Sequence, residues 1–300
     1  MMPPNMFTGC YTALVTPFSK SGGVDEQRLR ELVEFQIAGG VDGLVPCGTT
    51  GESPTLSHEE HNHVIELVVK FAAGRCKVIG GTGSNSTDEA ISMTQHAKQV
   101  GADASLQVAP YYNKPTQAGL YAHFRAIAEA VDLPMVFYNI PGRCGVDIAN
   151  ETMARLRREL PGRIVGLKEA TGTVDRVSQL RMLVDREFCI LSGDDSLTLP
   201  MMSVGAVGVI SVASNIVPRE VTDMVHAALK GDFERAGRIH AKLYPLFKDL
   251  FIETNPIPVK AAAAMMGLIE EGYRLPMVPM SDANRNQLRK TLLSFGLVKA

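Results

Sequence analysis

Cysteine is scarce in this sequence: five cysteines occur among 300 residues, at positions 10, 47, 76, 144 and 189. They are scattered and odd in number, and no two of them form a CxxC pair. The sequence therefore predicts neither a zinc ribbon nor a disulfide framework. We expect most of these cysteines to be reduced thiols in the core of a cytoplasmic protein.

Charge of one sign and long apolar runs are also missing. The net charge is −2, with acidic and basic residues mixed along the chain, so no basic field would attract nucleic acid or an anionic membrane. No apolar run is long enough to span a bilayer. Residues 1–7 lack the basic and apolar parts of a signal peptide. We therefore expect small-molecule partners, with no nucleic acid and no membrane.

A metal-binding pattern is present only in incomplete form. His58-Glu59-Glu60-His61 resembles HExxH, but that motif needs a second histidine where Asn62 stands. The two histidines are three residues apart and could share a helical face. Two surface histidines in a first helical turn explain the pattern as simply. We therefore expect no metal site.

Short apolar runs alternate with amphipathic helical patterns through residues 1–230. Eight such units in series predict an α/β fold of the (β/α)8 TIM-barrel type. Residues 231–300 read as a C-terminal helical extension packed on the barrel, with helices at about 232–250, 256–267 and 284–296. The expected strands are 11–15, 43–46, 77–80, 104–109, 135–138, 164–168, 188–191 and 207–212.

Helix start signals support this alternation. Asp25 precedes a helical pattern as an N-cap. Ser57 with Glu60, and Ser86 with Glu89, each fit a capping box at the start of a helix.

Lys168 follows the apolar run 164–167 and precedes a turn. Loss of water around an ammonium group at the mouth of a buried strand disfavours its charged form and lowers its pKa. A neutral lysine amine is a nucleophile that can form a Schiff base with a carbonyl compound. The plainer explanation is a lysine that extends to the surface at a strand end.

Other polar residues follow the expected strands, where the active sites of such barrels lie. Tyr138 could shuttle protons beside a nucleophilic lysine, held by the hydroxyl of Thr49. Arg143 offers a forked, permanently charged donor for a carboxylate. Thr50 and Tyr112 follow other strands. Turn, interface, core and local ion-pair roles explain each residue singly, but their shared barrel face favours a site.

Six segments, in order along the chain, resemble the dihydrodipicolinate synthase family of class I pyruvate-dependent aldolases. The resemblance covers nearly the whole sequence and is more specific than any single motif. The segments are GTTGE at 48–52, PYYN at 110–113, YNIPxR at 138–143, GLKEATG at 166–172, SGDD at 192–195 and NPIPVK at 255–260.

The resemblance implies catalytic roles for four residues. Lys168 would form a Schiff base with pyruvate, and Tyr138 would donate and accept protons. Thr49 and Tyr112 would complete a proton relay. Because the residue that corresponds to Tyr112 comes from a neighbouring subunit in the family, a homo-oligomer, dimer or tetramer, is implied.

The resemblance also implies the reaction and its remaining contacts. The lyase would condense pyruvate with L-aspartate 4-semialdehyde on the diaminopimelate route of lysine biosynthesis. Thr50 and Ile210 would contact pyruvate, Gly193 would lie near the substrate, and Arg143 would bind the semialdehyde carboxylate. No cofactor is implied, because the lysine supplies the electron sink.

Alternative functions share part of this pattern. N-acetylneuraminate lyase and 2-keto-3-deoxy sugar acid aldolases use the same lysine and tyrosine, but the lyases typically have an apolar residue at the position of Arg143. Cys144 departs from the threonine common in the synthases. A catalytically silent barrel that binds a ligand, and a metal-dependent aldolase, are further alternatives.

Feedback inhibition by L-lysine is a further implication. In lysine-inhibited family members, the amino acid binds at a dimer interface away from the Schiff base. Glu89 suits a ligand ammonium, and Asn85 and Tyr111 suit its carboxylate. The matching positions of this allosteric set are Pro54, His58, His61, Asn85, Glu89 and Tyr111.

Overall fold

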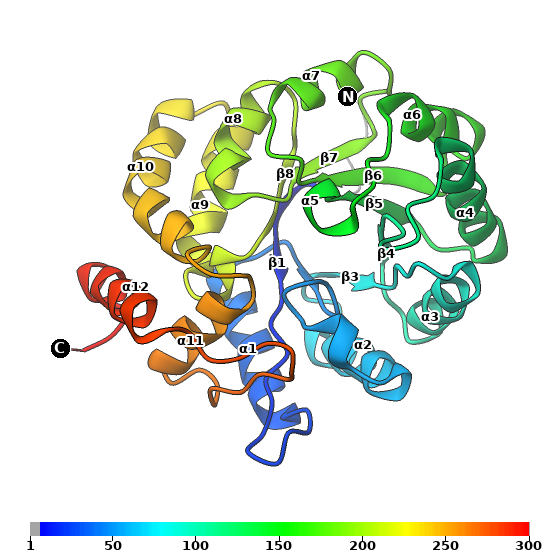
Figure 1. Cartoon of the computed structure of the whole chain (residues 1–300). Coiled ribbons are helices and arrows are strands. Elements are labelled where there is room, and N and C mark those ends of the chain that lie inside the picture. Colours follow the sequence, from blue (N-terminus) through cyan, green and yellow to red (C-terminus); the bar gives the residue numbers. More distant parts are fainter. Residues whose placement is uncertain (1–6, 300) are drawn as a thin grey trace.

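Eight parallel strands form a closed barrel at the centre of the molecule (Figure 1). The computed structural model describes residues 7–299. Each strand pairs with the next in sequence, and β8 pairs with β1. The predicted (β/α)8 fold is confirmed. The strands are β1 (Gly9–Ala13), β2 (Gly43–Val45), β3 (Lys77–Gly81), β4 (Ala104–Val108), β5 (Met135–Asn139), β6 (Ile164–Glu169), β7 (Cys189–Ser192) and β8 (Gly208–Ser211).

The strands are largely apolar and are buried on both faces, because two cores lie against them. An inner core fills the barrel and includes Tyr11, Ile79 and Val136. An outer core lies between the strands and the surrounding helices. Strands buried on both sides read as continuous apolar runs rather than alternating patterns. This explains why the strand positions were predictable.

The first strand begins and ends two residues before its predicted bounds of 11–15. Its pairing starts where the barrel closes, with Gly9 opposite Gly208. A Cβ on Gly208 would lie 1.9 Å from the carbonyl oxygen of Gly9, so this seam requires glycine. At the other end, the backbone N–H of Val15 donates to the Asn215 side chain instead of continuing the strand pairing.

Helices surround the barrel and alternate with the strands (Figure 1). The predicted Asp25 cap is confirmed, because its side chain accepts a hydrogen bond from the backbone of Arg28. The helices around the barrel are α1 (Glu26–Gly39), α2 (His58–Ala72), α3 (Thr87–Gln99), α4 (Gln117–Ala130), α5 (Pro141–Cys144), α6 (Asn150–Glu159), α7 (Asp175–Arg181), α8 (Thr198–Ser203) and α9 (Pro218–Leu229). Three short 3-10 turns are η1 (Ser53–Thr55), η2 (Asp195–Leu197) and η3 (Ala213–Asn215).

The two predicted capping boxes have different outcomes. Ser57 and Glu60 form the complete reciprocal pair at the start of α2. Ser86 caps α3 through its hydroxyl, but the Glu89 carboxylate accepts from the hydroxyl of Ser84 rather than from the Ser86 backbone. The second capping box is therefore wrong in its reciprocal half, because a neighbouring hydroxyl competes for the carboxylate.

Three helices follow the barrel: α10 (Phe233–Asp249), α11 (Ile257–Met265) and α12 (Asp282–Ser294). α10 packs against α9 and α12, and α11 packs against α12 and η3. Leu243, Val259 and Leu288 belong to the same outer core as the barrel helices. The proposed division at residue 230 therefore separates two parts that share one core.

No helix within residues 7–299 is long and apolar enough to cross a membrane.

Candidate active site

Lys168 and Tyr138 lie side by side on adjacent strands. β5 and β6 run parallel, with Tyr138 in register with Lys168. The Lys168 Nζ lies 4.2 Å from the centre of the Tyr138 ring. Both side chains are 5% exposed. Strand pairing thus brings together a nucleophile and a phenol that are 30 residues apart in sequence.

Burial lowers the pKa of Lys168 to about 7. The negative charge of Asp195 opposes this shift, and the positive charge of Arg143 adds to it. The strand-end lysine is therefore largely a neutral amine above pH 7. Its surface-exposed alternative is wrong, because the side chain is almost completely covered.

Tyr138 remains a protonated phenol at physiological pH. Burial raises its pKa to about 12, and a side-chain interaction with Thr49 offsets part of the rise. Thr49 lies in the loop after β2, which faces β5 across the end of the barrel. A phenol beside a neutral amine, with a hydroxyl next to it, can donate a proton and recover it.

Gly193 leaves space for the Lys168 side chain. A Cβ at this position would lie 2.7 Å from the Cβ of Ala170 and 3.3 Å from the Cε of Lys168. Ile210 on β8 is fully buried and belongs to the inner core that also contains Tyr138. Gly193 therefore lies beside the lysine, and Ile210 lies inside the barrel in the same core as Tyr138.

Asn255 connects Thr50 to Arg143. Its side-chain Nδ2 donates to the Thr50 Oγ1 over 3.0 Å, and its carbonyl accepts from an Arg143 guanidinium nitrogen over 3.1 Å. Asn255 precedes α11, so the C-terminal region contributes directly to the site. Sequence reasoning gave Asn255 no role, and its one signal was its place in the matching segment 255–260.

A cavity of about 420 Å³ opens beside these residues. Thr49, Tyr138, Arg143 and Asn255 line it together with residues of the predicted lysine site. Lys168 is not one of the lining residues; its Nζ lies against the ring of Tyr138, which does line the cavity. The members of the allosteric set in the lining are Pro54, His58, His61, Glu89 and Tyr111.

Tyr112 stands apart from the other predicted catalytic residues. Its side chain is 89% exposed, and its backbone has a left-handed φ of 71°. Few residues other than glycine adopt this conformation. The single chain therefore does not bring Tyr112 to Tyr138 and Thr49, and its role stays a prediction.

The two histidines of the allosteric set, both on α2, lie in different environments. His58 is exposed, whereas His61 is buried, and burial lowers the pKa of His61 to about 4. The surface interpretation is thus right for His58 and wrong for His61. Asn85 donates to the carbonyl of Tyr111 over 3.2 Å, which joins two further members of the allosteric set.

Within residues 7–299, no three His, Cys, Asp or Glu side chains gather as a metal site requires.

Asp195 has a role that its sequence position did not reveal. Its carboxylate accepts hydrogen bonds from the Ser211 hydroxyl and from the backbone N–H groups of Val212 and Ala213. Burial raises its pKa to about 6, although the Ser211 bond acts in the opposite direction. Asp195 thus fixes the end of β8 and supplies negative charge near Lys168.

The fold and site define a class: a (β/α)8 barrel with a neutral strand-end lysine beside a tyrosine has the design of a Schiff-base-forming enzyme. The comparison with known sequences identifies the family. The chain belongs to the dihydrodipicolinate synthetase family, whose sequence model matches residues 6–294.

Known relatives match over nearly their full length. A 4-hydroxy-tetrahydrodipicolinate synthase from Aquifex aeolicus (strain VF5) is 56% identical over 97% of this chain and 99% of the relative. The crystal structure of dihydrodipicolinate synthase from Aquifex aeolicus has a TM-score of 0.96 at 55% identity, and the match covers 98% of this chain and 100% of that one.

Two further solved structures carry small molecules. The chloride-inhibited dihydrodipicolinate synthase from Acinetobacter baumannii, complexed with pyruvate, is 47% identical with a TM-score of 0.94. The match covers 97% of this chain and 99% of that one. The enzyme from Cyanidioschyzon merolae, with lysine bound, is 43% identical with the same TM-score and the same coverage.

The ionisation of Lys168 is directly measurable. After reductive methylation with ¹³C-formaldehyde, the Lys168 methyl resonance should titrate near pH 7, whereas exposed lysines titrate at about 10.4. Lys168→Met assigns the resonance by removing it. Arg143→Ala should raise the pKa and Asp195→Asn should lower it, because each removes one of the charges that act on the amine. A Lys168 resonance that titrates with the exposed lysines would contradict the effect of burial.

Proposed function

We propose that this chain is a 4-hydroxy-tetrahydrodipicolinate synthase, which condenses pyruvate with L-aspartate 4-semialdehyde in lysine biosynthesis. The observation that carries this proposal is the burial of the Lys168 amine in register with Tyr138, which lowers the pKa of Lys168 to about 7. Family membership and the synthase names of relatives more than 50% identical support it over the other aldolases and over a silent barrel. The electron sink in this proposal is Lys168 itself, without a separate cofactor.

The first half of the reaction activates pyruvate. The Lys168 Nζ attacks the keto carbon, and a proton moves to the former carbonyl oxygen through Tyr138 and Thr49. Water leaves, and the imine nitrogen then withdraws electrons from the adjacent methyl carbon. Loss of a proton from that carbon gives an enamine. Thr50, Gly193 and Ile210 would contact the bound pyruvate.

The second half joins the two substrates. The enamine carbon attacks the aldehyde carbon of L-aspartate 4-semialdehyde, and the new alkoxide takes a proton from the tyrosine relay. Arg143 would bind the carboxylate of the semialdehyde, since its guanidinium is exposed at the mouth of the cavity. The amino group of the second substrate then displaces Lys168 as the ring closes, which regenerates the free lysine.

A homo-oligomer would complete the proton relay. Tyr112 is exposed in the single chain, next to Tyr111 at the cavity lining. Two adjacent exposed aromatic side chains are typical of an interface. We propose that Tyr112 enters the site of a second copy, in a dimer or tetramer.

A cytoplasmic location is part of the proposal, supported by the free thiols of Cys10, Cys47, Cys76 and Cys144.

The Schiff base gives the first functional prediction. Incubation with pyruvate and borohydride should add one reduced pyruvyl group per chain, and peptide mapping should locate it on Lys168. The yield should rise with pH through about 7, because only the neutral amine attacks. Lys168→Ala should remove the adduct. Tyr138→Phe should retain it while turnover falls roughly 10²- to 10⁴-fold. An adduct on any other lysine would exclude this assignment.

Substrate choice gives the second. Arg143→Ala should lower kcat/KM for L-aspartate 4-semialdehyde by roughly 10- to 150-fold, the equivalent of ~1.5–3 kcal/mol for a hydrogen bond to a charged group. The pyruvate adduct should still form. Arg155→Ala is the matched control. It removes a different arginine, one that belongs to an exposed ion pair, and it should retain activity. Faster cleavage of N-acetylneuraminate or a keto-deoxy sugar acid by the wild type would refute the synthase assignment.

We also propose feedback inhibition by L-lysine at the allosteric set. The lysine-bound relative supports this proposal, as does the cavity that five of the six residues line. Glu89 would pair with the ligand ammonium, whereas His61 is neutral at physiological pH and adds no competing charge. A ligand at the allosteric set would lie in the cavity that Thr49 and Tyr138 also line. By ordering Tyr111, it would act on the adjacent Tyr112.

Inhibition assays give the third functional prediction. Synthase activity of the wild type should fall as L-lysine is added, and Glu89→Ala should be much less sensitive. Asp88→Ala, which changes an exposed neighbouring carboxylate, should be inhibited like the wild type. Equal inhibition of the wild type and Glu89→Ala would show that lysine binds elsewhere.

A further inference from the structure

The loop that carries Thr49 and Thr50 begins and ends in a strained conformation. We call residues 47–52 the threonine loop. Its first and last residues, Cys47 and Glu52, have left-handed φ values of 56° and 54°. Side chains with a Cβ adopt this conformation at a cost in energy, and it persists where the surroundings impose it. The contacts of Glu52 identify those surroundings.

Lys260 forms a completely buried ion pair with Glu52. The Lys260 Nζ lies 2.5 Å from the Glu52 Oε1, and the side chains are 0% and 2% exposed. The ammonium also lies 4.2 Å from the centre of the Phe18 ring. Burial lowers the pKa of Lys260, and Glu52 opposes that shift. A buried charge is retained only when a partner neutralises it, so each of these side chains fixes the other.

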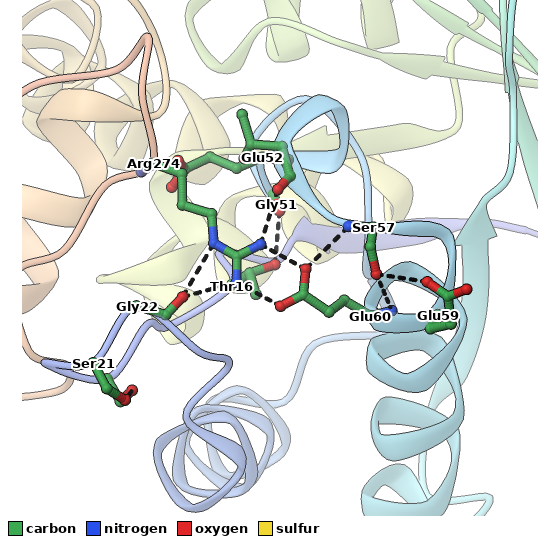
Figure 2. Close-up of polar contacts among 11 residues, drawn as sticks. Thr16, Ser21, Gly22, Gly51, Glu52, Ser57, Glu59, Glu60 and Arg274 are labelled. Atoms are coloured by element: carbon green, nitrogen blue, oxygen red, sulfur yellow. Dashed lines mark hydrogen bonds and ion pairs between the residues drawn. The ribbon is translucent and has the colours of Figure 1, made fainter.

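Arg274 holds the same end of the loop from a second direction (Figure 2). Its backbone N–H donates to the other Glu52 oxygen over 3.2 Å. Its guanidinium makes two 2.6 Å bonds to the Glu60 carboxylate and one 2.8 Å bond to the Gly22 carbonyl. Bidentate arginine–carboxylate pairs fix geometry as well as charge. The end of the threonine loop is thereby tied to the first turn of α2.

The middle of the threonine loop has its own anchors. The Thr16 hydroxyl donates to the carbonyl of Gly51 over 2.7 Å. Asn255 donates to Thr50, and its carbonyl accepts from Arg143. Lys260 follows Asn255 by five residues and lies on α11. One segment of the C-terminal region therefore holds Thr50 and Glu52 together.

We propose that Lys260 is a positioning residue for the reaction, and that its ion pair with Glu52 sets the position of Thr49 against Tyr138. This proposal rests on the proposed function, because it assumes that Thr49 and Tyr138 transfer protons. Lys260 has no exposed surface, so it acts through Glu52 rather than on a substrate. The pair should therefore affect turnover more than the binding of pyruvate.

The decisive variant removes both charges at once. Lys260→Met alone would leave the Glu52 carboxylate buried without its partner and would destabilise the fold. The double variant Lys260→Met/Glu52→Gln leaves no unpaired charge, and the amide oxygen can still accept from the Arg274 backbone. Replacement of a whole buried pair by neutral groups of similar size is often tolerated.

Three measurements on the full-length double variant separate positioning from stability. We expect a thermal midpoint close to that of the wild type and a borohydride-trapped pyruvate adduct on Lys168 with an unchanged concentration dependence on pyruvate. We expect kcat of the synthase reaction to fall roughly 10- to 100-fold, the effect of a catalytic group displaced by about 1 Å. Lys77→Met removes an exposed 2.6 Å ion pair with Asp103 at the opposite end of the barrel and should leave kcat unchanged.

Two results would overturn the proposal. A folded double variant with kcat within about twofold of the wild type would show that the pair does not position the relay. A double variant with a much lower thermal midpoint, whose folded fraction keeps the wild-type kcat, would assign the pair to stability alone. Failure of the proposed function would appear differently, as a wild type that forms no pyruvate adduct and no condensation product.

Discussion

The site depends on one buried amine, that of Lys168, whose protonation is weakened by its burial. Lys168 stands at the end of a strand whose side chains are all buried, and removal of water from its ammonium lowers its pKa to about 7. Asp195 limits the shift, and Arg143 extends it. Strand pairing then places Tyr138 in register beside the amine. The barrel thus places a buried amine and a phenol side by side, which are the two groups that the proposed Schiff-base chemistry uses.

A comparison of Lys168 with Lys260 shows how a single neighbouring side chain affects the charge of a buried lysine. Lys168 and Lys260 are both buried, and burial lowers the pKa of both. Only Lys260 has a carboxylate at 2.5 Å, which favours its charged form and blocks access to the nitrogen. Glu52 is 208 residues away in sequence. No local pattern could therefore show that Lys260 has a buried partner.

The parts of the fold that were predictable depend on local patterns. Buried parallel strands are continuous apolar runs, so their positions and order could be read from the sequence and then placed Lys168, Tyr138 and Thr49 at one end of the barrel. Features that depend on distant partners were missed. Asp195 binds backbone groups after β8, and Asn255 joins Thr50 to Arg143. Tyr112 remains outside the site of its own chain, because a single chain does not contain its proposed partner.

The C-terminal region contacts the candidate active site directly, through Asn255 and through Lys260 on α11. They follow a barrel whose helices and strands are complete by α9, so residue 230 is a natural boundary in secondary structure. The stabilising contacts, however, cross that boundary. Without Lys260 and Arg274, the carboxylate of Glu52 would stay at the end of a strained loop without its cation and without a backbone donor. Removal of one partner from a buried ion pair is strongly destabilising, because it leaves an uncompensated buried charge. The extension therefore fixes one end of the threonine loop even though its helices lie outside the barrel, and this contact is the basis of the positioning role that we propose for Lys260.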